Sequence, residues 1–162
     1  MDIIYTGERL IKNKKSCFLA GPTPRDKNTL SWRGEAIEIF NRLGFDGAIY
    51  VPELKNKSYY DNETSDYEIS LDQEMLEEAD IVMFWMPRDI NMLGLSSNVE
   101  FGYLLNKGNI IYGRPDDAIR CEFLDFLYEK KLGKKYLTTL EDTIKETIKN
   151  LESRYDDEKV WK

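Results

Sequence analysis

Glu100 is a single acid among small, polar and apolar residues in the stretch GLSSNVEFGYLL, residues 94–105. A carboxylate there could attack the anomeric carbon of a sugar, because a departing base leaves an oxocarbenium-like centre that an anion stabilises. Gly94 and Gly102 nearby would let backbone and sugar approach closely. A purely structural interpretation competes, because Ser97 to Glu100 fits the capping box S-x-x-E at the start of a helix. From these residues alone, both interpretations stay open.

Asp72 is the second candidate acid and lies eight residues before Asp80. It could protonate a leaving base or bond to it, since glycosyl chemistry generally pairs an acid with a nucleophile or base. It could equally be an acid on a solvated helix face that complements the helix dipole. Asp80 stands between a helix and a strand, and we interpret it as a turn residue bonded to backbone N–H groups.

Candidate ligand-binding groups stand in the expected loops. Gly21 follows a predicted strand in FLAGPTPR, and a glycine there suits a backbone contact to a ligand. Gly-Pro is also a common loop sequence without any function. The loop arginines could each hold a phosphate or carboxylate, or simply lie at the surface. Ser96, Ser97 and Asn98 precede a predicted helix and are the better phosphate cradle. Aromatic residues that could stack on a base are Trp32, Tyr59, Tyr60, Trp85 and Tyr103, with core packing favoured for Trp32 and Trp85.

The composition excludes several kinds of site. No histidine is present among the 162 residues, so Ser-His-Asp triads, Cys-His pairs and His-ligated metal sites are excluded. The net charge of −7 argues against nucleic acid as a partner. Cys17 and Cys121 form no metal-binding pattern, and Cys17 is expected to be buried. We expect no metal, no cofactor, no signal peptide and no membrane-spanning segment, and a cytoplasmic location.

Strands and helices are predicted to alternate along the chain. Buried strands are expected at 16–20, 48–51, 80–86 and 109–112, with a short strand or arm at 3–5 and a weak strand near 135–137. Helices are expected at 30–43, 69–79, 98–105, 117–130 and 140–154, with Ser70 and Gln73 as a possible capping box. Residues 55–67, rich in tyrosine, form a long loop of the kind that often covers a site.

This alternation predicts a three-layer α/β/α sandwich with about five mostly parallel strands, flavodoxin-like in the order 2-1-3-4-5. We expect a single domain over 1–162, with residues 1–15 as an N-terminal arm and 155–162 as a frayed tail. Ligands of such sheets bind at the carboxyl ends of the strands. The loop after 16–20, the loop before Glu100 and the loop YGRPDD are therefore expected to converge.

Several stretches together resemble the nucleoside 2-deoxyribosyltransferase family, in its deoxyribosyltransferase-like branch. They are CFLAGPTPR, SWRGEA, YVPE, LDQEMLEEADIVMFWMPR, GLSSNVEFGYLL and YGRP, in family order over residues 16–115. The resemblance implies a flavodoxin-like fold, cleavage of an N-glycosidic bond, a small-molecule nucleoside or nucleotide substrate and a homodimer or larger oligomer. It implies Glu100 as the nucleophile at the sugar C1′, Asp72 as the acid that contacts the base, and the loop from Phe18 to Pro22 as part of the pocket.

The candidate catalytic residues are thus Glu100 and Asp72. The candidate substrate-binding residues are Phe18, Ala20, Gly21, Pro22, Arg25, Trp32, Arg88, Gly94, Ser96, Ser97, Asn98, Gly102 and Arg114. Two positions depart from the family pattern. Phe18 stands where a tyrosine is common, and Gly94 stands nearest to the usual aspartate before the glutamate, with Asp89 further upstream.

Transfer and hydrolysis share a glycosyl-enzyme intermediate, so the sequence does not separate them. Ser96 and Ser97 also suit the related N-glycosidases that hold a 5′-phosphate with serines. A non-catalytic sensor of a nucleotide-like ligand is an alternative, suggested by the Tyr-rich loop and the missing aspartate. An NAD glycohydrolase is another, because NAD has an N-glycosidic bond beside phosphates.

Overall fold

The computed structural model describes residues 1–56 and 65–160 of the chain. Its elements are β1 (Asp2–Tyr5), β2 (Ser16–Ala20), α1 (Trp32–Arg42), β3 (Ala48–Val51), α2 (Asp66–Glu78), β4 (Ile81–Trp85), α3 (Leu95–Leu104), the short 3-10 helix η1 (Leu105–Lys107), β5 (Ile110–Gly113), α4 (Glu122–Leu132) and α5 (Leu140–Val160). Most of the predicted Tyr-rich loop, including Tyr59 and Tyr60, lies outside the described residues.

The sheet has five parallel strands in the order β1-β3-β2-β4-β5, which confirms the predicted α/β class. The predicted order counts the strand at 16–20 as the first. Numbered in this way, β3-β2-β4-β5 has the predicted order 2-1-3-4. The sheet differs from the prediction at its two edges. β1 is a full edge strand, paired with β3 from Asp2–Ala48 to Tyr5–Val51. The expected strand near 135–137 is reduced to a single bridge between Leu137 and Gly113, where the preceding lysines are exposed.

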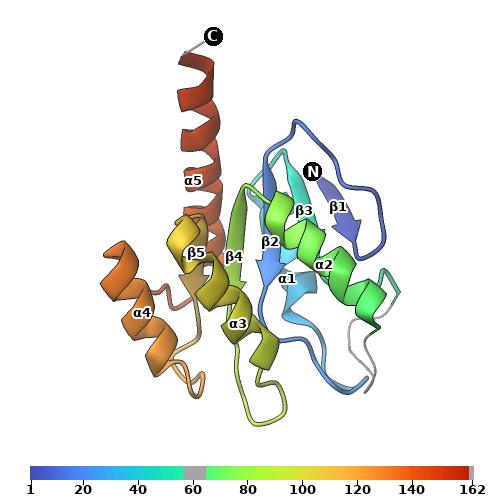
Figure 1. Ribbon diagram of the computed structural model, residues 1–162, viewed down its shortest axis with the longest axis vertical. Coiled ribbons are helices and arrows are strands. Elements are labelled where there is room, and N and C mark those ends of the chain that lie inside the picture. Colours follow the sequence, from blue (N-terminus) through green and yellow to red (C-terminus); the bar gives the residue numbers. More distant parts are fainter. Residues whose placement is uncertain (57–64, 161–162) are drawn as a thin grey trace.

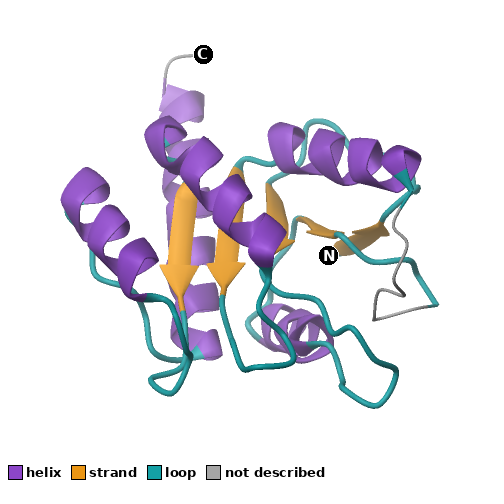
Figure 2. Cartoon of the chain, turned by 60° about the horizontal axis from the view of Figure 1, so that its bottom comes forward, coloured by secondary structure: helices purple, strands orange, loops and turns teal. Residues whose placement is uncertain are grey.

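Helices cover both faces of this sheet (Figures 1 and 2). Successive side chains of a strand point to opposite faces, so Cys17 and Leu19 pack in one core cluster with α1 and α5. Phe18 and Ala20 pack in the other cluster, with α2, α3 and α4. Trp32 and Trp85 belong to the first cluster, as predicted, and Cys17 is fully buried.

Three helices have bounds other than the predicted ones. α2 begins at Asp66 because Ser65 and Glu68 form its capping box, so the suggested Ser70–Gln73 box is wrong. α4 begins only at Glu122, since residues 117–121 are not helical. α5 continues to Val160 and projects beyond the sheet, where a frayed tail was expected (Figure 1).

Asp80 joins β4 to β2 at the amino ends of the strands. Its Oδ2 accepts hydrogen bonds from the Ser16 N–H at 2.8 Å, from the Ser16 hydroxyl at 2.8 Å and from the Tyr155 hydroxyl at 3.1 Å. This confirms its interpretation as a residue bonded to backbone N–H and places it at the edge away from the carboxyl ends. Among the described helices, none is both long and apolar enough to cross a membrane.

Candidate active site

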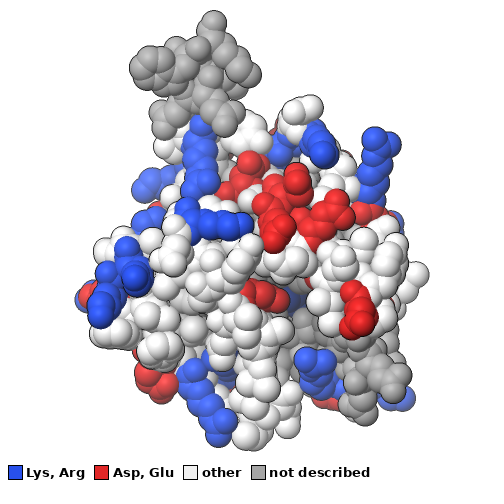
Figure 3. Space-filling view, in the orientation of Figure 1, with Lys and Arg blue, Asp and Glu red and all other residues white. Residues whose placement is uncertain are grey.

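A cavity of about 300 Å³ opens at the carboxyl ends of β2 and β3, between α2 and α3. It is lined by Phe18, Ala20, Gly21, Thr23, Arg25, Arg33, Pro52, Ile69, Asp72, Gln73, Leu76, Ser96, Ser97 and Glu100. The space-filling view shows a hollow between these helices in which acidic and basic side chains lie close together (Figure 3). Of the sequence-predicted site residues, eight meet here: Phe18, Ala20, Gly21, Arg25, Asp72, Ser96, Ser97 and Glu100.

The start of α3 is held against the loop after β2. Gly94, the N-cap of α3, has a left-handed backbone with φ 59°, which glycine adopts at little cost. A Cβ at Gly94 would lie 2.8 Å from the Cβ of Pro22, so a larger residue would push the helix away from the loop. Arg88 is buried and donates hydrogen bonds to the Gly94 carbonyl and the Asn98 side-chain oxygen. These contacts place the first turn of α3 at the cavity.

Glu100 lies more than one turn inside α3, because the helix begins at Leu95 rather than at Asn98. The capping-box interpretation of Ser97 and Glu100 is therefore wrong, and the N-cap makes no side-chain hydrogen bond. Ser96 and Ser97 precede Glu100 by one helical turn, the spacing that puts side chains on one face. All three residues line the cavity.

The Glu100 carboxyl is electrostatically unusual. Burial raises its pKa to about 7, the charge of Asp72 also raises it, and the charge of Arg33 lowers it. Within the described part of the chain, Glu100 forms no hydrogen bond or ion pair. A carboxylate without a bound partner that faces a cavity is available to react with a ligand.

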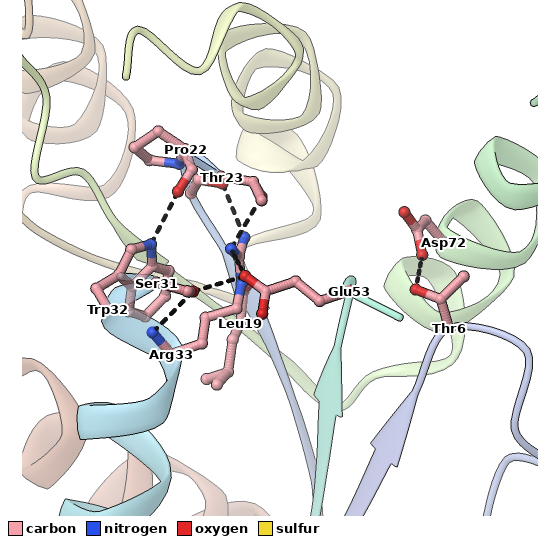
Figure 4. Close-up of polar contacts among 10 residues, drawn as sticks. Thr6, Leu19, Pro22, Thr23, Ser31, Trp32, Arg33, Glu53 and Asp72 are labelled. Atoms are coloured by element: carbon pink, nitrogen blue, oxygen red, sulfur yellow. Dashed lines mark hydrogen bonds and ion pairs between the residues drawn. The ribbon is translucent and has the colours of Figure 1, made fainter. Parts of the chain in front are cut away.

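Asp72 faces the same cavity from α2. Its Oδ1 accepts a hydrogen bond of 2.6 Å from the hydroxyl of Thr6, which is buried just after β1 (Figure 4). The residue that follows the edge strand, a segment expected as a short strand or arm, thus fixes the orientation of this acid. The two carboxyl groups come from separate helices, and both residues line one cavity.

A buried network that we did not predict forms the floor of the site. Arg33 is 2% exposed, and its guanidinium donates to the carbonyls of Leu19 and Gly21, to Thr23 and to Glu53 (Figure 4). Charged residues in a sequence normally indicate surface positions. Arg33 lies in the stretch SWRGEA and Glu53 in YVPE, but no pattern within either stretch indicates that these charged residues are buried.

The other sequence-predicted residues do not line the cavity. Trp32 is packed in the core and donates from Nε1 to the Pro22 carbonyl at 3.0 Å, which supports the loop. Arg88, Gly94 and Asn98 hold the start of α3, as described above. Gly102 is exposed, with open space around it. Arg114 forms an ion pair of 2.9 Å with Asp125 and lies over the Tyr136 ring, which occupies its guanidinium.

In residues 1–56 and 65–160, no group of three or more His, Cys, Asp or Glu side chains could hold a metal ion.

Comparison with protein families finds a match to the model described as nucleoside 2-deoxyribosyltransferase like, over residues 14–118. The match covers well over half of the chain and includes every residue that lines the cavity. Thr6, α4 and α5 lie outside it. No curated protein matches the chain.

Proposed function

Because the chain belongs to the nucleoside 2-deoxyribosyltransferase-like family, we propose that it cleaves or transfers the N-glycosidic bond of a (deoxy)nucleoside or its 5′-monophosphate, with Glu100 as nucleophile. The family implies a small-molecule nucleoside substrate. The observation that carries the proposal is Glu100 itself, a carboxyl group with a raised pKa and no bound partner, opposite Asp72 in one cavity.

The reaction follows from these two positions. A Glu100 oxygen attacks C1′, the bond between C1′ and the base nitrogen breaks, and the base leaves with the electron pair and takes a proton from the Asp72 side. The product is an ester between Glu100 and the sugar. Attack on C1′ by water or by a second base then restores the Glu100 carboxylate, and gives hydrolysis or transfer respectively.

The first turn of α3 suits a 5′-phosphate. Its backbone N–H groups receive no side-chain cap, and the positive end of the helix dipole lies at the cavity. The hydroxyls of Ser96 and Ser97 and the guanidinium of Arg25 line the same space. We therefore place the phosphate of a nucleotide substrate at this end and the base toward Asp72.

A substrate panel tests the proposal. The protein is incubated with deoxynucleosides, ribonucleosides, their 5′-monophosphates and NAD, each alone and with a second free base, and the products are separated chromatographically. Released base indicates hydrolysis, and an exchanged nucleoside indicates transfer. Tight binding without turnover and without a covalent adduct would instead support a sensor, and nicotinamide release would support an NAD glycohydrolase.

The pH dependence of kcat/KM is the first prediction. Glu100 must be ionised to attack, and its pKa is raised to about 7, so the acidic limb of kcat/KM should rise about tenfold per pH unit and end near pH 7. Initial rates from pH 4.5 to 9 measure this. An acidic limb near pH 4.5, the range of an ordinary glutamate, would contradict the role assigned to the Glu100 carboxyl.

Asp72→Asn is the second prediction. It keeps the shape of the side chain and its acceptor for Thr6 but removes the acid, so we expect kcat to fall by roughly 10²-fold. The loss should be smaller for an analogue whose base departs without protonation. Thr6→Val removes the hydroxyl that orients Asp72, and it should lower kcat about tenfold. If Asp72→Asn lowers kcat equally for both kinds of leaving group, Asp72 does not deliver the proton.

We also propose that copies of the chain associate into a dimer or larger oligomer. Leu95, Val99 and Tyr103 form an exposed stripe at helical spacing on α3, and Phe123 and Phe126 are exposed on α4. Sedimentation velocity over a range of concentrations measures the assembly.

A further inference from the structure

Arg33 places a buried positive charge beside the candidate nucleophile. Its side chain lines the same cavity as Glu100, and its charge acts on the Glu100 carboxyl. Four of the five guanidinium N–H groups have described partners: Nε donates to Leu19 O at 2.9 Å, Nη2 to Gly21 O at 2.8 Å, and Nη1 to Thr23 at 2.9 Å and Glu53 at 2.8 Å. The guanidinium is thus bound to the loop after β2.

Glu53 supplies the negative charge that matches Arg33. It is 5% exposed, and its Oε1 also accepts a hydrogen bond of 2.6 Å from Ser31, the N-cap of α1. Glu53 does not line the Glu100 cavity; it lines a separate groove on the α1 side, and Arg33 lines both. The guanidinium therefore lies between two carboxyl groups and is paired with only one of them, as Figure 4 shows for the Glu53 side.

This choice of partner matters because a buried cation without a counter-charge is strongly unfavourable. If Glu53 were neutral, Glu100 would be the negative group left beside Arg33 in the cavity. An ion pair there would hold the carboxylate oxygens that must reach C1′. With Glu53 charged, the guanidinium stays on the loop.

We propose that Glu53 is a positioning residue that keeps the Arg33 guanidinium engaged with the loop after β2, so that Glu100 meets its substrate as an unpaired carboxylate. The proposal rests on the proposed function for its catalytic meaning, but the charge arrangement can be measured without turnover. The charged groups that face Glu100 are Arg33 of α1, Asp72 of α2 and Arg25 of the loop between β2 and α1. Those that face Arg33 are Glu53 and Glu100.

Direct titration of Glu100 tests the proposal. The protein is labelled with ¹³C at the glutamate side-chain carboxyl, the Glu100 signal is assigned by its absence in Glu100→Gln, and its shift is followed from pH 4 to 9. In Glu53→Gln the guanidinium loses its counter-charge, so the Glu100 midpoint should fall by about one pH unit or more. At pH 8, where Glu100 is ionised in both proteins, kcat should fall by roughly tenfold.

Three further variants keep the test decisive. Glu53→Asp retains the charge and should leave the midpoint near that of the wild type. Arg33→Met with Glu53→Met removes both charges, a replacement that is often neutral for stability, and should raise the midpoint even if Glu53→Gln does not fold. Glu74→Gln, on the exposed face of α2, makes the same net charge change and should leave the midpoint in place.

The proposal is overturned if Glu53→Gln leaves the midpoint unchanged or raises it, or if the double variant does not raise it. An unchanged titration together with base release by the wild type rejects the role of Glu53 and keeps the proposed function. If the Glu100 midpoint shifts as expected in the variants but the wild type releases no base, the charge arrangement is supported and the proposed function is rejected.

Discussion

Glu100→Gln should lose base release on every substrate that the wild type cleaves, by on the order of 10⁴-fold or more. The amide fills the same space in the cavity but cannot attack C1′ or form the glycosyl ester. Mass spectrometry of wild-type protein quenched during turnover should show the added mass of the sugar, and the variant should show none. Glu74→Gln, an exposed change on α2, is the matched control and should keep full activity. A variant that retains more than a few per cent of the wild-type rate would exclude Glu100 as the nucleophile.

The same variant should be more stable than the wild type at high pH, which shows that its inactivity does not come from unfolding. The folded pKa of Glu100 is about 7 and its ordinary value is 4.5, so the folded state binds more protons between these values. The free energy of unfolding of the wild type therefore falls as the pH rises through this window. At pH 8 we expect Glu100→Gln to exceed the wild type by roughly 2 kcal/mol, less than the full shift implies because the carboxyl is partly exposed. At pH 4 the two proteins should agree.

Gly21→Ala should destabilise the fold by about 3 kcal/mol or more, the largest stability effect that we expect from a single methyl group. Gly21 has φ +149°, and its added Cβ would lie 2.1 Å from the carbonyl oxygen of Trp85 and 2.9 Å from the Trp32 ring. The carbonyl is backbone and cannot move aside without opening the ladder between β2 and β4. Urea titration should show a lower midpoint with an unchanged slope.

Gly34→Ala provides the control for that substitution. Gly34 lies within α1, its added Cβ would meet nothing within 4 Å, and alanine is the better helix former by up to about 1 kcal/mol. The two variants add the same methyl group and should change stability in opposite directions. A similar small effect of both would show that the loop after β2 adapts easily, and that Gly21 is not needed for the close approach of loop and strand.

The sequence predicts the scaffold of this site well, because its signals are local. The apolar run at 80–86 and the Gly-Pro after 16–20 each indicate a buried strand followed by a loop, and chirality then allows few strand orders. Three features depend on contacts between distant residues and were not predictable in this way. The start of α3 is set by the close approach of Gly94 to Pro22 and by the hydrogen bond from Arg88 to the Gly94 carbonyl. Ser97 and Glu100 match the sequence pattern of a capping box but lie inside the helix.

The floor of the site shows the same limit. Arg33 and Glu53 are charged residues whose burial depends on each other, and no pattern within either segment reveals the pair. Asp72 is oriented by Thr6 of the N-terminal segment, which sequence patterns suggested only as a short strand or arm. All the residues that line the cavity lie within the region that the family model matches, but the partners of each side chain come from the fold.

The parallel sheet also determines when, during folding, Glu100 acquires its raised pKa. Parallel neighbours need long crossovers, and the contact between Ser16 and Asp80 closes a span of 64 residues. Such non-local closures are slow steps in folding. Until β2 and β4 are paired and α3 packs over them, Glu100 is an ordinary solvated acid that is fully ionised at neutral pH. The raised pKa of Glu100 is therefore a property of the completed fold and is absent from the newly made chain.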